Sequence, residues 1–179
     1  MKTQWLGITR ALAVSGVTDF SFVDEESKWR GSEVHRMIEL ADRGTLDKKT
    51  VPAELRGFLA AHRKFNRETG FISQEIEFTV QDKSLGVRGR IDRAGLMHGK
   101  RTIIDFKTGT LNPAVALQLC MGGHLLDKLA WFHRYAVQLK PDGNYSVRHF
   151  ALMEWHADLT TALACCRVAA WKIKNGGAR

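Results

Sequence analysis

The stretches Gly89-Arg90-Ile91-Asp92-Arg93 and Thr102-Ile103-Ile104-Asp105-Phe106-Lys107-Thr108-Gly109 decide how this chain is expected to fold. Both contain apolar runs short enough to be strands, and the turn-like Met97-His98-Gly99-Lys100 lies between them. A two-residue loop at His98-Gly99 would pair Met97 with Lys100 and, in the same register, Asp92 with Asp105. Residues paired in this way have β-carbons about 5 Å apart. The sequence therefore predicts a hairpin over about 86–107 that brings two carboxylates together.

Lys107 follows Asp105 by two residues, so strand alternation places both side chains on one face. Two carboxylates suit Mg²⁺ or Mn²⁺, because hard divalent ions prefer oxygen ligands, and such an ion can activate water or stabilise charge on a phosphate. Lys107 would then position the water or stabilise the developing negative charge. The alternative is structural, since two carboxylates on neighbouring strands can simply form salt bridges with Arg90 or Arg93.

The composition is that of one globular domain. The 179 residues are 44% hydrophobic and 26% charged, without an internal repeat or a Pro/Ser-rich linker, so a single domain over residues 1–179 is expected. No window approaches the roughly 18 apolar residues of a membrane span, and no membrane partner is expected. Three cysteines without metal-ligand spacing fit reduced thiols, which favours a cytoplasmic location.

The charge balance points to a polyanionic partner. Lys and Arg number 27 against 19 Asp and Glu, which gives a net charge of +8. A surface of this kind attracts phosphate, so nucleic acid becomes a reasonable partner. Charge alone does not decide the point, because many basic proteins bind no nucleic acid.

Periodicity, caps and turn residues predict the remaining elements. A short helix over 8–15 ends at Gly16, and a long one runs from the cap residue Asp24 to about Arg43. Another starts at Pro52 and ends at Gly70. Alternation over 71–80 predicts a strand, with Ile72, Ile76, Phe78 and Val80 on one face. After the hairpin we expect a helix from Pro113 to about Leu129, strands over Trp131–Leu139 and Tyr145–Leu152, and a last helix that begins after His156 or Asp158, runs to about Lys174 and has Leu159, Leu163, Cys166 and Ala170 as a stripe.

This order of elements predicts the fold class. Helices, three strands, a helix, two strands and a final helix give a mixed α/β (α+β) architecture. We expect a central mixed, largely antiparallel β-sheet flanked by helices.

Two further residue types extend the candidate site. Glu77 lies on the polar face of the 71–80 strand and would supply a third carboxylate, although Glu75 has the same facing. His35 lies in the first long helix, and imidazole is a common ligand in Mn²⁺-type sites. The structural alternatives are an ordinary solvated strand face for the glutamates and a surface or core position for the histidine.

Taken together, these residues resemble the PD-(D/E)XK nuclease superfamily, specifically its RecB-like and phage-type exonuclease branch, over nearly the whole chain. One position departs from the family pattern: Gly122 stands where the family has the tyrosine of QL-x-x-Y. This departure weakens the roles that the resemblance assigns through this helix, above all the guidance of the DNA strand. The segments that carry the resemblance are Leu6–Leu12, similar to the N-terminal helix; Arg30–His35, similar to RG-x-x-VH; Gly89–Arg93, similar to G-x-(I/L)-D-R; Ile104–Gly109, similar to D-(Y/F/I)-K-T-G; Gln118-Leu119, similar to the start of QL-x-x-Y; and Val137–Gly143, similar to a hairpin of phage members.

The resemblance implies a restriction-endonuclease-like core and a role for each matching residue. His35, Asp92 and Asp105 would hold Mg²⁺ or Mn²⁺, and Lys107 would be catalytic. Gln118 would help to place the DNA strand or the site, and the family's upstream acidic residue maps best to Glu77. Arg88, Arg90, Lys140, Arg148 and Lys172 are the candidate contacts to the DNA backbone.

The function expected from this resemblance is a metal-dependent DNA exonuclease, a phosphodiester hydrolase of phage or bacterial recombination or repair. A phage setting would imply a single-strand annealing protein as partner and the cytoplasm of a bacterial host cell as location. Two other functions stay open: a structure-specific endonuclease of the resolvase or restriction type, and a catalytically idle DNA-binding module. The oligomeric state is left open.

Overall fold

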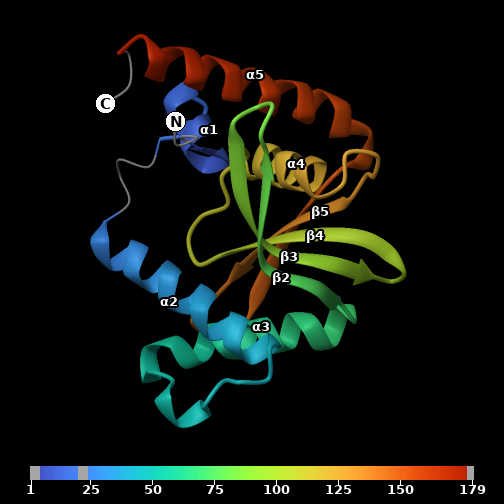
Figure 1. Cartoon of the computed structure of the whole chain (residues 1–179). Coiled ribbons are helices and arrows are strands. Elements are labelled where there is room, and N and C mark those ends of the chain that lie inside the picture. The colour runs from blue at the N-terminus through green and yellow to red at the C-terminus, as the bar shows by residue number, and fades with distance from the viewer. Residues whose placement is uncertain (1–4, 20–23, 177–179) are drawn as a thin grey trace.

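The structure, a computed structural model, describes residues 5–19 and 24–176. Its helices and strands follow in the predicted order, with one extra short strand at the start (Figure 1). The helices are α1 (Ile8–Ser15), α2 (Glu25–Asp42), α3 (Arg56–Thr69), α4 (Val115–Leu126) and α5 (Trp155–Lys174), and the strands are β1 (Leu6–Gly7), β2 (Ile72–Asp82), β3 (Val87–Met97), β4 (Lys100–Lys107), β5 (His133–Leu139) and β6 (Tyr145–Phe150).

The strands of the described residues form one sheet in the order β1-β3-β4-β5-β6, with β2 paired to β3. The pairs β2–β3, β3–β4 and β5–β6 are antiparallel, whereas β1 runs parallel to β3 and β4 runs parallel to β5. The predicted fold class, a mixed and largely antiparallel sheet flanked by helices, is confirmed.

The β3–β4 hairpin has the predicted two-residue loop. His98 and Gly99 have φ values of 50° and 73°, as the two central residues of a type I′ turn require. Pairing then runs in the predicted register from Met97–Lys100 to Arg93–Ile104. The length of this loop thus decides which residues of the two strands face each other.

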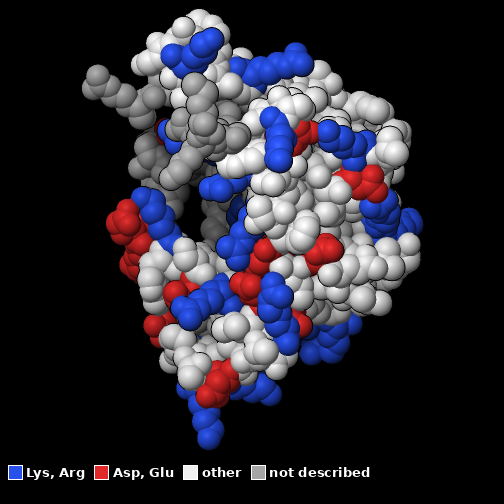
Figure 2. All heavy atoms as spheres, in the orientation of Figure 1, with Lys and Arg blue, Asp and Glu red and all other residues white. Residues whose placement is uncertain are grey.

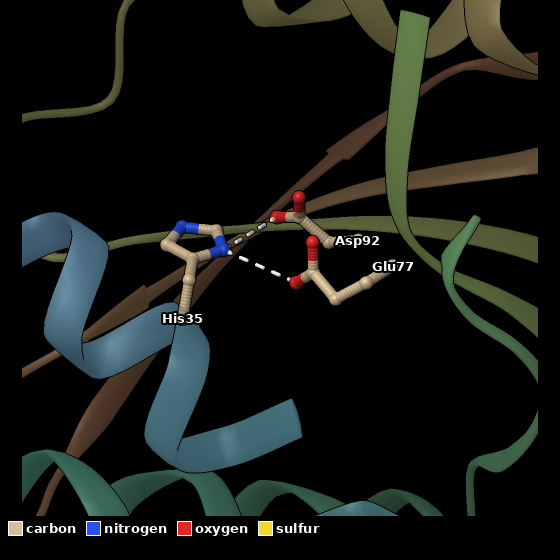
Figure 3. Close-up of side chains that lie close together, drawn as sticks. All are labelled: His35, Glu77 and Asp92. Atoms are coloured by element: carbon tan, nitrogen blue, oxygen red, sulfur yellow. Dashed lines mark ion pairs between the residues drawn. The ribbon is translucent and has the colours of Figure 1, made fainter. Parts of the chain in front are cut away.

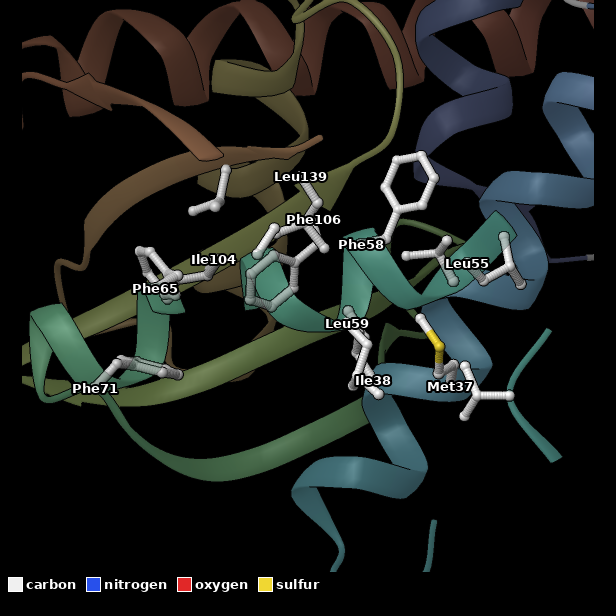
Figure 4. Packing of buried hydrophobic residues seen from close by; sticks show 14 of the residues in the cluster. Met37, Ile38, Leu55, Phe58, Leu59, Phe65, Phe71, Ile104, Phe106 and Leu139 are labelled. Carbon is white, nitrogen blue, oxygen red and sulfur yellow. The ribbon is translucent and has the colours of Figure 1, made fainter. Parts of the chain in front are cut away.

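Helices cover both faces of the sheet: α1, α4 and α5 lie on one face, and α2 and α3 lie on the other (Figure 1). The core on the α2–α3 side contains Ile38, Phe65 and Phe106, together with further apolar side chains of both helices and of β4 and β5 (Figure 4). On the opposite side Leu119 of α4 and Trp155 of α5 pack against the sheet. Within the described ranges, no helix is both long enough and apolar enough to cross a bilayer.

The predicted ends of α2 and α3 are confirmed by their capping residues. The Asp24 carboxylate accepts a hydrogen bond from the Ser27 N–H at 2.6 Å, so it satisfies one of the free amides at the start of α2. Gly70 follows the last residue of α3 with a φ of 60°, the left-handed conformation that favours glycine.

The predicted helix over 8–15 is confirmed as α1, which ends at Gly16. Leu6-Gly7, which the resemblance grouped with that helix, is extended instead, because the Leu6 N–H donates to the Gly86 carbonyl oxygen beside β3. Two other predicted boundaries are wrong. Helix α4 ends at Leu126, since Asp127 is extended and its side chain accepts the Leu129 N–H instead. Helix α5 begins at Trp155, and neither His156 nor Asp158 caps it; Asp158 pairs with the buried Arg134.

Two predicted faces also differ from the structure. On β2, Ile72 is 64% exposed, because the pairing with β3 shifts between Ser73 and Glu75 and alternation is lost there. Phe78, next to Glu77 with its positive φ, is 41% exposed. On α5, Ala170 is exposed. The buried stripe of that helix is instead formed by Trp155, Ala162, Cys165, Cys166 and Ala169.

Candidate metal centre

Strands β3 and β4 separate at Asp92. Their ladder ends at the pair Arg93–Ile104, one step before the predicted pairing of Asp92 with Asp105. Asp92 Oδ2 instead accepts a hydrogen bond from the Phe106 N–H at 2.8 Å. The expected direct cross-strand pair is therefore replaced by a side-chain contact across diverging strands, and the two carboxylates border the opening between them.

Glu77 enters the site through an unusual backbone conformation. Its φ is 50°, a value that residues with a side chain seldom adopt, and the β2–β3 pairing passes directly from Ile76–Arg93 to Phe78–Ile91. The Glu77 carboxylate is almost fully buried and lies 2.7 Å from Arg90 Nε. The alternative candidate, Glu75, lines a different cavity. The structure therefore favours Glu77, as the sequence alignment did.

His35 points from α2 toward both of these carboxylates (Figure 3). Its Nδ1 lies 3.5 Å from Glu77 Oε1 and 3.6 Å from Asp92 Oδ2. One potential ligand atom from each of the three residues lies within 4.8 Å of the others. This spacing suits a small cation held by one imidazole and two carboxylates.

Asp105 lies beside this cluster rather than in it. Its Oδ1 accepts hydrogen bonds from Lys107 Nζ and from Gln118 Nε2 of α4, both at 2.9 Å. Its Oδ2 lies 2.7 Å from Lys107 Nζ, yet this buried oxygen accepts no hydrogen bond of good geometry from the described residues. The predicted grouping of Asp105, Lys107 and Gln118 is thus present, and Asp105 keeps one oxygen available for a ligand.

Electrostatics show how closely the charges are packed. The Asp92 carboxylate raises the pKa of His35 to about 9, against the effect of burial. Burial raises the pKa of Asp92 to about 6. Burial would also lower the pKa of Lys107, but the neighbouring charges of Asp105 and Asp92 outweigh it and raise that pKa. Burial opposes ionisation of Glu77, but hydrogen bonding and charge from His35, together with the nearby arginines, lower its pKa.

The cluster lies in an open cleft of about 880 Å³ between α2 and the sheet. Figure 2 shows Lys and Arg side chains next to acidic ones around this hollow. Arg90 lines the cleft together with Lys28 and Arg36 of α2. A second hollow of about 390 Å³ adjoins it, because Thr9 and Arg90 line both.

The remaining predicted DNA contacts have different positions. Arg88 and Gln118 line the adjoining hollow. Lys140 begins the turn between β5 and β6, and Arg148 is exposed on β6 with its guanidinium 5.2 Å from the Phe150 ring. Lys172 Nζ donates to the Val14 carbonyl oxygen at 2.9 Å, which links α5 to α1.

The residues present fit a hard divalent cation. His35, Glu77 and Asp92 offer one nitrogen and two carboxylates, and Asp105 Oδ2 is a buried oxygen next to them without a hydrogen-bond donor of good geometry. Mg²⁺ and Mn²⁺ accept such donor sets and leave positions for water or phosphate. The sequence had assigned His35, Asp92 and Asp105 as ligands, with Glu77 as a further carboxylate, and in the structure Glu77 lies in one cluster with His35 and Asp92.

Sequence reasoning missed the largely buried residues that contact the metal centre, directly or through one another, without being candidate ligands. Arg93 had been considered only as a salt-bridge partner, and it contacts Glu77 and Asp42 at once. Asp42 and His62 had no assigned role, although they form a buried ion-pair contact of 3.2 Å. No local motif marks Asp42 or His62, and the motif that contains Arg93 does not reveal its partners, because these lie in other elements.

No protein-family model matches this chain, and no curated protein matches it. Among solved structures, it is similar to a candidate exonuclease from Eubacterium rectale, with a TM-score of 0.60 and 10% sequence identity over 99% of this chain and 84% of that chain. It also matches an alkaline exonuclease from Laribacter hongkongensis, with a TM-score of 0.37 and 16% identity over 98% and 95% of the two chains. The same enzyme in complex with dAMP gives a TM-score of 0.37 and 14% identity over 97% and 94%.

The similarity to the Eubacterium rectale structure shows the fold: a mixed α/β sheet with helices on both faces. Fold and site together define a domain in which a histidine, three carboxylates and a lysine converge at a point where two strands separate.

Proposed function

We propose that this protein is a metal-dependent DNA exonuclease of the PD-(D/E)XK superfamily. The observation that carries the proposal is the convergence of His35, Glu77 and Asp92 from three different elements within 4.8 Å. The Asp105–Lys107 pair of β4 lies directly beside them. Structural salt bridges alone do not require an imidazole, two carboxylates and a lysine at one open cleft, with a further carboxylate paired to that lysine.

Each residue has a task in phosphodiester hydrolysis. His35, Glu77, Asp92 and Asp105 would hold Mg²⁺ or Mn²⁺, which supplies charge neutralisation for the phosphate and a more acidic water. The Lys107 ammonium would orient the attacking water or stabilise negative charge that develops on the phosphate. Gln118 donates to the same Asp105 oxygen as Lys107 and so would keep that carboxylate in place.

The choice of DNA and of exonuclease action rests on three further points. The net charge of +8 favours a polyanionic substrate, and Arg88 and Arg90 line hollows at the site. One solved structure that shares this fold is described as a candidate exonuclease, and the sequence motifs resemble the phage-type exonuclease branch. In a phage setting we further propose a recombination role in a bacterial host cell, with a single-strand annealing protein as partner.

The test compares linear DNA with covalently closed circles of the same sequence. We expect Mn²⁺ or Mg²⁺ to support degradation of linear DNA, EDTA to stop it, and closed circles to survive. Cleavage of the circles would favour an endonuclease. A protein that binds DNA but degrades no linear substrate, single- or double-stranded, with either metal would be a binding module.

Two substitutions test the site assignment. We expect Asp105→Ala and Lys107→Ala each to lower hydrolysis by at least about 100-fold, while DNA binding largely survives. Asp105→Ala removes a proposed metal ligand, and Lys107→Ala removes the positive charge proposed to stabilise the phosphate. Asp127→Ala and Lys100→Ala are matched controls, since both residues are exposed or half-exposed and lie outside the cleft. Undiminished cleavage by either site variant would refute the assignment.

A further inference from the structure

A buried guanidinium contacts residues of the candidate metal centre. Arg93 follows Asp92 on β3, and its side chain is fully buried. Its Nη1 donates to Glu77 Oε1 at 3.3 Å and to the Asp92 carbonyl oxygen at 2.5 Å. Its Nε donates to Asp42 Oδ2 at 2.6 Å. One side chain therefore holds two candidate ligands at the same time, Glu77 by its carboxylate and Asp92 by its main chain.

The residues that Arg93 contacts also belong to elements that carry the residues of the metal centre. Asp42 is the last residue of α2, the helix that carries His35. The Arg93 guanidinium carbon lies 5.7 Å from the centre of the Phe106 ring, and Phe106 separates Asp105 from Lys107 on β4. Arg93 thus joins the four elements that supply the site residues, namely α2, β2, β3 and β4.

Asp42 is itself held from the neighbouring helix α3. His62 Nε2 lies 3.2 Å from Asp42 Oδ2, and Asn66 Nδ2 donates to Asp42 Oδ1 at 3.3 Å. His62 is also buried, 5.1 Å from Phe106 in an edge-to-face arrangement. The Nε side of the guanidinium is therefore anchored, through Asp42, to the core between α2 and α3.

From these contacts we infer that Arg93 is a positioning residue, which sets the geometry of the metal centre by fixing the Glu77 carboxylate and the Asp92 main chain. The inference rests on the proposed function, because it concerns the same metal site. Glu77 needs such support, since its φ of 50° is seldom adopted by a residue with a side chain. The second arginine that contacts Glu77, Arg90, is 60% exposed, so water competes for that contact more effectively.

The chemistry requires an arginine at this position. A guanidinium presents several N–H donors in a rigid plane and can reach Asp42, Glu77 and a carbonyl oxygen together. A lysine ammonium has the same charge on a flexible stem and does not reproduce this fork. Arg93→Lys therefore keeps the charge and removes the bridging geometry.

The chain offers a matched control on the other side of the sheet. Arg134 on β5 is also fully buried, pairs with Asp158, and donates to the carbonyl oxygens of Ala116 and Ala151. Its contacts join β5 to α4 and to the segment before α5, and none of these residues lines the cleft. Arg134→Lys therefore measures what the same substitution costs the fold alone.

The experiment measures Mn²⁺ binding by the electron paramagnetic resonance signal of free Mn²⁺, together with the melting temperature and nuclease activity. We expect both Arg→Lys variants to melt at a lower temperature, and only Arg93→Lys to bind Mn²⁺ more weakly, by about tenfold to a hundredfold, as found for groups that orient metal ligands. Saturating Mn²⁺ should restore part of its activity. If Arg93→Lys does not fold, Asp42→Asn against Asp158→Asn makes the same comparison with the guanidinium left in place.

Each result has one meaning. If the Arg93→Lys variant binds Mn²⁺ as tightly as the wild type, the role of Arg93 is overturned and the nuclease proposal still stands. The same holds for the Asp42→Asn variant if Arg93→Lys does not fold. An equal loss of affinity in the two members of a matched pair would also overturn this role, because the effect would then come from general destabilisation. A wild-type protein that binds no Mn²⁺ would instead overturn the proposed metal site itself.

Discussion

His35 is the residue at which protonation and metal binding compete. Its pKa is raised to about 9, first by the charge of Asp92, so the imidazole is protonated at neutral pH in the metal-free protein. Only a neutral imidazole can act as a ligand, and Mn²⁺ must therefore displace a proton. Metal affinity should fall as the pH falls, by about tenfold per pH unit between pH 8 and pH 6.5.

Calorimetry in buffers of different ionisation enthalpy measures this proton directly. We expect about one proton released per Mn²⁺ bound at pH 7, and a much smaller release in His35→Gln. His98→Asn is the control, because His98 lies in the β3–β4 turn, where its φ of 50° is also tolerated by asparagine. Binding of Mn²⁺ without proton release by the wild type would show that His35 is not a ligand.

Among single residues, those in local motifs were predictable from the sequence, and those that depend on long-range contacts were not. Asp92, Asp105 and Lys107 follow from one hairpin whose loop sets the register. The role of Arg93 was missed, because its partners Asp42 and Glu77 lie in two other elements. The positive φ of Glu77 was also beyond prediction, since a non-glycine residue adopts it only when its surroundings enforce it.

Helix packing gives a prediction at the scale of elements, through two glycines in helices. In α3, a Cβ at Gly57 would overlap the Pro141 carbonyl oxygen of the β5–β6 turn. Gly31 in α2 has room, with the Thr108 hydroxyl 3.8 Å from the same position. We expect Gly57→Ala to lower the free energy of unfolding by about 1–3 kcal/mol through overpacking. Gly31→Ala should raise it by up to about 1 kcal/mol, because alanine favours helix.

Urea denaturation of the two variants measures both changes, with the wild type as reference. An unchanged stability in Gly57→Ala would mean that α3 and the β5–β6 turn are not packed as closely as the structure has them. The pair of variants separates the effect of the contact from that of helix propensity, since both replace a helical glycine by alanine.

The elements themselves were largely predictable, because most have a clear period and a capping residue. Helix α2 starts after Asp24 and α3 ends at Gly70, as expected. The failures have a common physical cause in tertiary contacts that override the local pattern. β1 exists only because Leu6-Gly7 pairs with Val87-Arg88, some eighty positions further along the chain.

At the scale of the whole molecule, the site is a consequence of topology. β3 pairs with β1 at its start and with β4 at its end, so the edge between these two pairings is open at Asp92. Helix α2 supplies His35, whose side chain points to Asp92 at this opening (Figure 3). The sequence predicted the fold class, and the site residues that it suggested through motif resemblance lie close together in the structure, while their roles stay predictions. It did not predict the separation of the strands, which depends on the side chain of Asp92 taking the Phe106 N–H.

The net charge of +8 acts over the whole surface, but only charges that touch the DNA backbone contribute counterion release. Arg88 is exposed and lines the hollow next to the cleft. Arg167 is exposed on α5, and helices α1 and α4 lie between α5 and α2 (Figure 1). The two variants Arg88→Gln and Arg167→Gln make the same change in total charge. We expect Arg88→Gln to reduce the slope of log Kd against log salt by about 1, as for a lost phosphate contact, and Arg167→Gln to leave it unchanged. Fluorescence anisotropy of a labelled duplex in EDTA gives these slopes without cleavage. Equal slopes for all three proteins would move the DNA path away from the hollow lined by Arg88, because the attraction would then come from the overall charge.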